Sequence, residues 1–175
     1  MNQLAHHCLA AQLAPCLAAA PARVVVVASA AARWPGAEQA LEAALDGRDS
    51  AGPPFAAYAG SKLANVAWSR AAASRWASAG VTVVALHPGI APSGLQRNMG
   101  IIGAAMNALT AAAGGDVNAS AGRVVAAATA AEPYECAGAF PLDSACGTAF
   151  DERVWAAGEA ALHETGAESV CGGVK

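Results

Sequence analysis

The stretch RVVVVAS (23–29) holds four consecutive β-branched residues, and VTVVAL (81–86) is a second run of the same kind. A strand that is apolar at nearly every position is typical of a parallel sheet covered on both faces. The segment 57–79 between them contains no proline and is predicted to form one long helix, with Gly80 as its left-handed cap. These segments predict two parallel strands joined through a helix.

Helix and strand signals alternate outward from this unit. Segment 2–20 is rich in Ala and Leu and is predicted to be a helix that Pro15 kinks or shortens. Further elements are expected as a short helical turn at 37–45, a helix at 119–131, a short strand at 137–142 and an amphipathic helix at 152–165. We therefore predict an α/β fold in a single domain, 1–175, with a partial doubly wound parallel sheet of about three strands and flanking helices.

Composition excludes several classes of protein. Ten Lys and Arg against thirteen Asp and Glu give a net charge of −3 and no basic face for nucleic acid. Five Cys without a CxxC pair point to reduced thiols, with no metal site, in preference to a disulfide or zinc framework. No segment reaches the ~20 apolar residues of a membrane span, and no signal peptide is recognisable. We expect a cytoplasmic or organellar stromal protein that is not secreted, although 118–120 matches a glycosylation sequon.

Tyr58 and Lys62 are candidates for acid–base chemistry. They stand four residues apart at the start of the predicted long helix and therefore share one of its faces. A nearby ammonium favours the phenolate and lowers the pKa of a tyrosine below its ordinary value of about 10. Such a tyrosine can exchange a proton with a carbonyl or an alcohol. The same spacing also suits a solvated pair without any chemistry, so it does not decide between the two.

Two further candidates follow the predicted strands. Ser29 ends the first strand, and His87-Pro88-Gly89 ends the second. Ligands of parallel α/β sheets bind beyond the carboxyl ends of the strands, so these residues are expected at one rim together with Tyr58. The structural alternatives are a hydroxyl that bonds strand-end backbone groups at Ser29, and a plain turn at Pro88-Gly89.

Several motifs resemble the short-chain dehydrogenases/reductases, above all their retinol dehydrogenase, WW-domain oxidoreductase and protochlorophyllide reductase-like branch. The motif YAGSKLAN (58–65) is similar to the family's YxxSKLAN. The similarity extends to NQLAHHCLAAQLAP (2–15), RVVVVAS (23–29), VTVVALHPGIAPSGL (81–95), GRVVAAATA (122–130) and DERVWAAGEAAL (151–162). It covers nearly the whole chain from residue 2 and implies the C-terminal part of a Rossmann-type fold.

The resemblance implies an oxidoreductase that interconverts a carbonyl and an alcohol by hydride transfer. Tyr58 would be the catalytic acid or base, and Lys62 would lower its pKa and bind the nicotinamide ribose. Ser29 would hold the substrate oxygen, and Asn2 would hold a water of the proton relay. Dinucleotide choice cannot be deduced from these residues, but the family resemblance favours NADP over NAD.

The resemblance also assigns residues around the cofactor and the substrate. Pro88 and Gly89 would lie against the nicotinamide, and Ser93, at a position where the family usually has Thr, would meet the carboxamide. Segment 94–118 would form a substrate lid. Its content of Ala, Ile and Met favours a small apolar carbonyl or alcohol as substrate.

The chain departs from the family in its first half. The family's TGxxxGIG loop, its ribose-binding residue and its NNAG segment have no counterpart in these 175 residues, and Ala28 replaces the first serine of a Ser-Ser pair. The nucleotide-binding half is therefore expected to be absent, which leaves strand 24–28 as an apolar edge prone to self-association. The alternative function is a non-catalytic remnant that acts as an interaction module.

Overall fold

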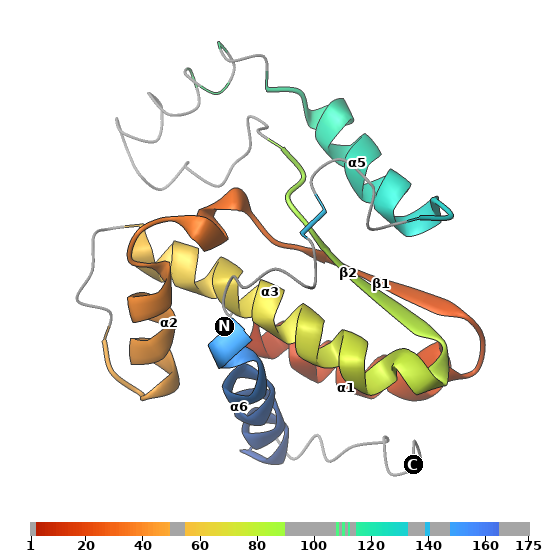
Figure 1. Ribbon diagram of the computed structural model, residues 1–175, viewed down its shortest axis with the longest axis horizontal. Coiled ribbons are helices and arrows are strands. Elements are labelled where there is room, and N and C mark those ends of the chain that lie inside the picture. Colours follow the sequence, from red (N-terminus) through yellow and green to blue (C-terminus); the bar gives the residue numbers. More distant parts are fainter. Residues whose placement is uncertain are drawn as a thin grey trace.

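The structure is a computed structural model, and it describes residues 3–49, 55–89, 108, 110, 112, 115–132, 139–140 and 148–164. The α-helices are α1 (Leu4–Ala18), α2 (Ala37–Leu45), α3 (Ala56–Trp76), α5 (Val117–Thr129) and α6 (Asp151–Glu164). The strands are β1 (Ala22–Val27) and β2 (Val81–Leu86). Short 3-10 turns are η1 (Ala30–Arg33), η2 (Ala77–Ala79) and η5 (Thr148–Phe150) (Figure 1).

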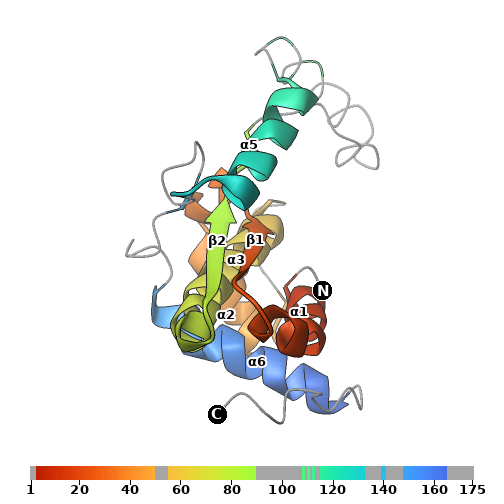
Figure 2. The ribbon, with the colours of Figure 1, turned by 90° about the vertical axis from the view of Figure 1, so that its right-hand side faces the viewer.

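The predicted parallel strand pair is confirmed. β1 and β2 pair in parallel from Ala22 opposite Val81 to Val27 opposite Leu86. Helix α3 joins them and is buried along most of its length, with Leu63, Val66 and Trp68 almost inaccessible. Figure 2 shows α5 on one side of the sheet and α3 and α1 on the other, with α6 beyond these two helices. The α/β class therefore holds for the described residues.

The third predicted strand differs from the expectation. Of 137–142 the structure describes only 139 and 140, and Ala139 forms a single antiparallel bridge with Leu86. The amide of Phe140 donates to the carbonyl of Ala85 at 2.8 Å. The described sheet thus has two parallel strands, and the antiparallel bridge replaces the predicted third parallel strand.

The helix boundaries follow the sequence signals closely. Helix α1 continues three residues beyond Pro15 and ends at Ala18, so this proline does not end the helix. Helix α3 passes into a 3-10 turn, and Gly80 caps it with a φ of 73°, as predicted. Gly60 brings α3 against α2, because a side chain there would meet the backbone nitrogen of Leu41 at 2.9 Å. The small residues of α3 therefore allow two backbones to approach.

The two strands differ in how deeply they are buried. Every residue of β2 except Thr82 is buried, as expected for a strand covered on both faces. In β1 only Val26 is buried, and Val27 is 39% exposed. The prediction of full burial is therefore wrong for β1, because β2 is its only strand neighbour in the described sheet.

Two arginine side chains connect helices α5 and α6 to the unit formed by the sheet and α3. The buried guanidinium of Arg70 in α3 forms two hydrogen bonds, of 2.9 and 2.6 Å, with the carboxylate of Asp151 at the start of α6. Arg23 of β1 donates to the carbonyls of Ala127 and Ala130 at 3.0 and 2.7 Å, which satisfies the last turn of α5. These contacts hold α6 and α5 against the central unit.

None of the described helices combines the length and the apolar character needed to cross a bilayer. The described residues also contain no group of three His, Cys, Asp or Glu side chains placed to hold a metal ion.

Candidate active site at the carboxyl end of the sheet

Tyr58 and Lys62 lie in the first two turns of α3, at the end of the sheet where both strands finish (Figure 1). The Nζ atom of Lys62 is 5.9 Å from the centroid of the Tyr58 ring. The same Nζ donates to the carbonyl oxygen of Val27, the last residue of β1, at 3.0 Å. Burial lowers the pKa of Lys62, because desolvation penalises the ammonium. The helix spacing and this hydrogen bond together fix the amine beside the phenol ring.

Ser29 lies two residues beyond Val27, the residue whose carbonyl binds Lys62. Its backbone is extended and it begins η1, a turn that packs against α3. The Oγ atom accepts a hydrogen bond from the amide of Ala31 at 3.2 Å. Ser29 therefore makes the backbone hydrogen bond that was the structural alternative to a role in chemistry. It uses one lone pair of the hydroxyl, and the O–H proton is not needed for it.

The turn after β2 leaves the sheet beside Ser29. Val27 and Leu86 are the last pair of the register, and the amide of Ala28 donates to the carbonyl of Leu86 at 2.8 Å. Pro88 and Gly89 follow at this end, so the turn and Ser29 lie on neighbouring chain segments. Ser29 and the Pro88-Gly89 turn therefore follow directly from two strand ends that lie side by side.

Arg123 of α5 holds this turn, a contact that the sequence analysis did not predict. Its Nη1 atom donates to the carbonyl of Pro88 at 2.8 Å. Gly89 has a φ of 100°, and a side chain on it would overlap the Arg123 guanidinium. Burial, followed by the charge of Arg123, lowers the pKa of His87. Glycine at position 89 thus makes room for the guanidinium.

Asn2, Ser93 and most of the expected lid, 94–118, lie outside the described residues. The last residues of the lid, from Val117, instead begin α5. Direct contacts join Lys62 to Tyr58 and to the end of β1, and Arg123 to the turn. A phenol, an amine and a hydroxyl at the rim of a parallel sheet form a set of groups suited to proton transfer.

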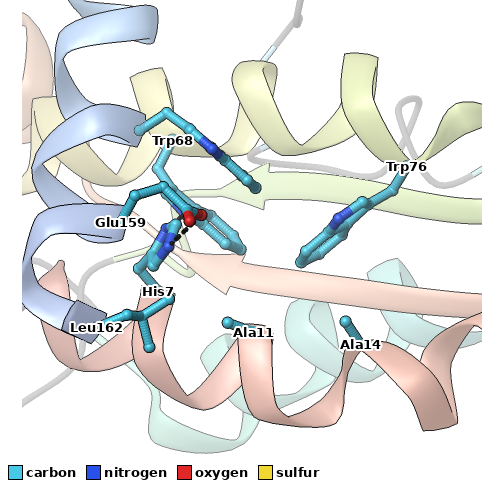
Figure 3. Close-up of a pocket in the computed structure, with 8 residues that line it drawn as sticks. His7, Ala11, Ala14, Trp68, Trp76, Glu159 and Leu162 are labelled. Carbon is cyan, nitrogen blue, oxygen red and sulfur yellow. Dashed lines mark hydrogen bonds and ion pairs between the residues drawn. The ribbon is translucent and has the colours of Figure 1, made fainter. Parts of the chain in front are cut away.

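A second cluster of polar and aromatic side chains lies between α1, α3 and α6, and the sequence analysis missed it (Figure 3). The Nε1 atom of Trp68 donates to Nδ1 of His7 at 2.9 Å, so the proton of the neutral ring sits on Nε2. That Nε2 donates to the Glu159 carboxylate at 3.1 Å. His7 also packs edge-to-face on Trp155. The residues come from three distant helices, so no local spacing could have revealed them.

A side chain at position 158 is expected to destabilise the protein because Gly158 packs against this cluster. A side chain at position 158 would overlap the His7 imidazole, which is 1% exposed and cannot move into solvent. Gly158→Ala should lower the free energy of unfolding by about 1–3 kcal/mol. The matched control is Gly122→Ala in α5, where nothing lies within 4 Å of the new side chain. It should raise the free energy of unfolding by about 0.5–1 kcal/mol, measured by urea denaturation.

His7 is expected to make stability depend on pH. Burial lowers its pKa below the ordinary 6.5, although Glu159 opposes that shift. As the pH falls below 6.5, His7 of the unfolded chain becomes protonated. His7 of the folded chain becomes protonated only at a lower pH, because its pKa is lowered. The contribution of His7 to the free energy of unfolding should be fully present above pH 6.5. It should decline as the pH falls from 6.5 to the lowered pKa of folded His7. His7→Gln should remove this part of the decline in urea denaturation, whereas the exposed His6→Gln should retain it.

Comparison with known proteins gives no match: no protein-family model, no curated protein and no solved structure is significantly similar to this chain.

Proposed function

We propose that this chain is an NAD(P)-dependent oxidoreductase of the short-chain dehydrogenase/reductase class that interconverts a carbonyl and an alcohol. The observation that carries the proposal is the position of Lys62. Its ammonium is fixed to the carbonyl of Val27 and lies beside the ring of Tyr58, where the family that the chain resembles has its acid–base pair. The wider YAGSKLAN motif, to which both residues belong, and the Pro88-Gly89 turn also support the proposal.

The chain's own residues would manage the proton. In the reducing direction the hydroxyl of Tyr58 protonates the developing alkoxide, and the ammonium of Lys62 stabilises the phenolate that remains. Ser29 donates its O–H to the same oxygen while its lone pair keeps the bond from Ala31. A bound nicotinamide would supply or accept the hydride.

The residues present fit one part of such a cofactor. Lys62, Pro88 and Gly89 lie at the carboxyl end of the sheet, where the ribose and the nicotinamide would be held. A glycine-rich loop for the diphosphate does not occur in the 175 residues. The proposal therefore assigns the chemical half of the site to this chain and favours NADP only through the family resemblance. The substrate class is a small apolar carbonyl or alcohol.

The second candidate is an interaction module without catalysis, and the exposure of β1 favours it. Val27 is 39% exposed, and Val24 and Val25 are only half-buried on a strand that β2 alone pairs within the described sheet. An apolar strand edge pairs readily with another chain. Self-association through this edge would appear as oligomers in light scattering, and a monodisperse monomer with a cooperative melt would exclude that self-association.

Titration with NADPH separates the two candidates. The oxidoreductase proposal predicts saturable binding, followed by tryptophan fluorescence, and weaker binding after Lys62→Met because the ribose contact is lost. The interaction module predicts no change up to about millimolar cofactor, which corresponds to a binding free energy near 4 kcal/mol. Trp34→Phe, a change in an exposed side chain, is the control for the fluorescence signal.

A further inference from the structure

A cavity of about 230 Å³ lies between α1, α3 and α6, away from the Tyr58–Lys62 pair. Figure 3 shows Trp68 and Trp76 on one side, Ala11 and Ala14 opposite them, and His7 and Glu159 at one end. The lining residues are His7, Ala11, Ala14, Trp68, Trp76, Trp155, Glu159 and Leu162. Three of the chain's four tryptophans therefore meet at one cavity.

The size of this cavity sets it apart from ordinary packing. Protein interiors are close-packed and contain few voids larger than one water molecule. Here Ala11 and Ala14 present only methyl groups, while Trp76 and Trp155 stand nearly perpendicular, at 81°, with their ring centroids 6.1 Å apart. Large rings facing small residues leave a space with aromatic walls. The space is partly open at the half-exposed Glu159, so a small solute can enter it from solution.

The charge of the lining is negative. The Glu159 side chain is 48% exposed, and its Oε1 accepts the bond from neutral His7. Arg75 lies outside the lining, with its guanidinium carbon 4.5 Å from the centroid of the Trp155 ring. Its charge is compensated by Glu152 at 2.7 Å. The Arg75 guanidinium therefore occupies one side of the Trp155 ring, and the net charge that the lining itself contributes is that of the Glu159 carboxylate.

We propose that this cavity binds a small methylated ammonium cation, of the quaternary type found in choline. Indole rings attract such a cation through cation–π interactions, and Glu159 supplies the opposite charge. A primary ammonium would need acceptors for three N–H bonds, and a metal ion would need several ligands. Among the described lining residues Glu159 is the one carboxylate, so the lining does not supply enough ligands for either a primary ammonium or a metal ion. Methylated nitrogen needs no hydrogen bond, and its methyl groups fit apolar walls.

The experiment is a choline titration of the purified chain, followed through the indole N–H signals in proton–nitrogen NMR spectra. Saturable shifts are expected for Trp68, Trp76 and Trp155, and none for Trp34, which is exposed elsewhere and serves as the internal reference. The neutral isostere 3,3-dimethylbutan-1-ol has the same shape without the charge. It should bind at least about tenfold more weakly, as expected when cation–π and carboxylate attraction are lost. Equal affinity for both compounds, or no shift up to about 100 mM choline, overturns the proposal.

Two variants locate the site. Ala14→Leu should fill the cavity and abolish the choline-dependent shifts, with an unchanged or higher melting temperature. Glu159→Gln keeps an oxygen that accepts from His7 but removes the charge, so choline affinity should fall about five- to tenfold. Its half-exposed position allows the variant to fold even if Ala14→Leu does not. Undiminished choline affinity in the folded Ala14→Leu protein, or in Glu159→Gln, contradicts the assignment.

Discussion

Tyr58→Phe is expected to reduce turnover about 10²- to 10⁴-fold and to leave the affinity for NADPH unchanged. The variant removes one oxygen, the group proposed to exchange the proton, and retains the ring beside the Lys62 ammonium. The described contacts of Tyr58 include no hydrogen bond from its hydroxyl. Ser61 donates at 2.8 Å to the backbone carbonyl of Tyr58, which the variant retains. Stability should therefore change little. The measurement is steady-state reduction of a small apolar aldehyde, with cofactor binding by fluorescence.

The controls separate loss of chemistry from loss of structure. Thermal melting of Tyr58→Phe should match that of the unaltered chain. Lys62→Met should weaken cofactor binding as well as turnover, because Lys62 is proposed to serve both the ribose and Tyr58. Turnover near that of the unaltered chain in Tyr58→Phe would eliminate the assigned acid–base role. A loss of NADPH binding in the same variant would instead show that the phenol belongs to the cofactor site.

Asp151→Asn is expected to lower the free energy of unfolding by about 3 kcal/mol. The side chain of Arg70 is 6% exposed. Its Nε and Nη2 atoms both donate to the Asp151 carboxylate, whereas its Nη1 atom has no partner among the described residues. Removing the carboxylate charge leaves a buried cation without compensation. The effect should extend beyond the pair, because it joins the middle of α3 to the start of α6. Urea denaturation at neutral pH measures it.

A neighbouring ion pair between the same two helices provides the control. Arg75 and Glu152 bond at 2.7 Å, but the Glu152 side chain is 79% exposed. Glu152→Gln should leave the urea midpoint almost unchanged, since water replaces the lost partner. The double variant Arg70→Met, Asp151→Leu should recover much of the lost stability because no charge remains buried. Equal losses in Asp151→Asn and Glu152→Gln would contradict this explanation.

Local patterns predicted the helices and both parallel strands well. The β-branched runs determine β1 and β2, and the absence of proline between residues 57 and 79 allows α3 to form without interruption. The pair Tyr58 and Lys62 could be found for the same reason, because four residues on a helix always share a face. The antiparallel bridge at Ala139 was not predicted, since strand direction depends on where the chain returns and not on its own residues.

The sequence by itself determined the two strands, their connecting helix and the facing of an amine and a phenol, because each of these depends on residues close together in the chain. Tertiary structure alone decided that Lys62 bonds the end of β1, that Arg123 fills the space beside Gly89, and that His7 meets Glu159. Each of these contacts joins residues 34 or more positions apart, and the packing of whole helices, which no local period encodes, sets their geometry.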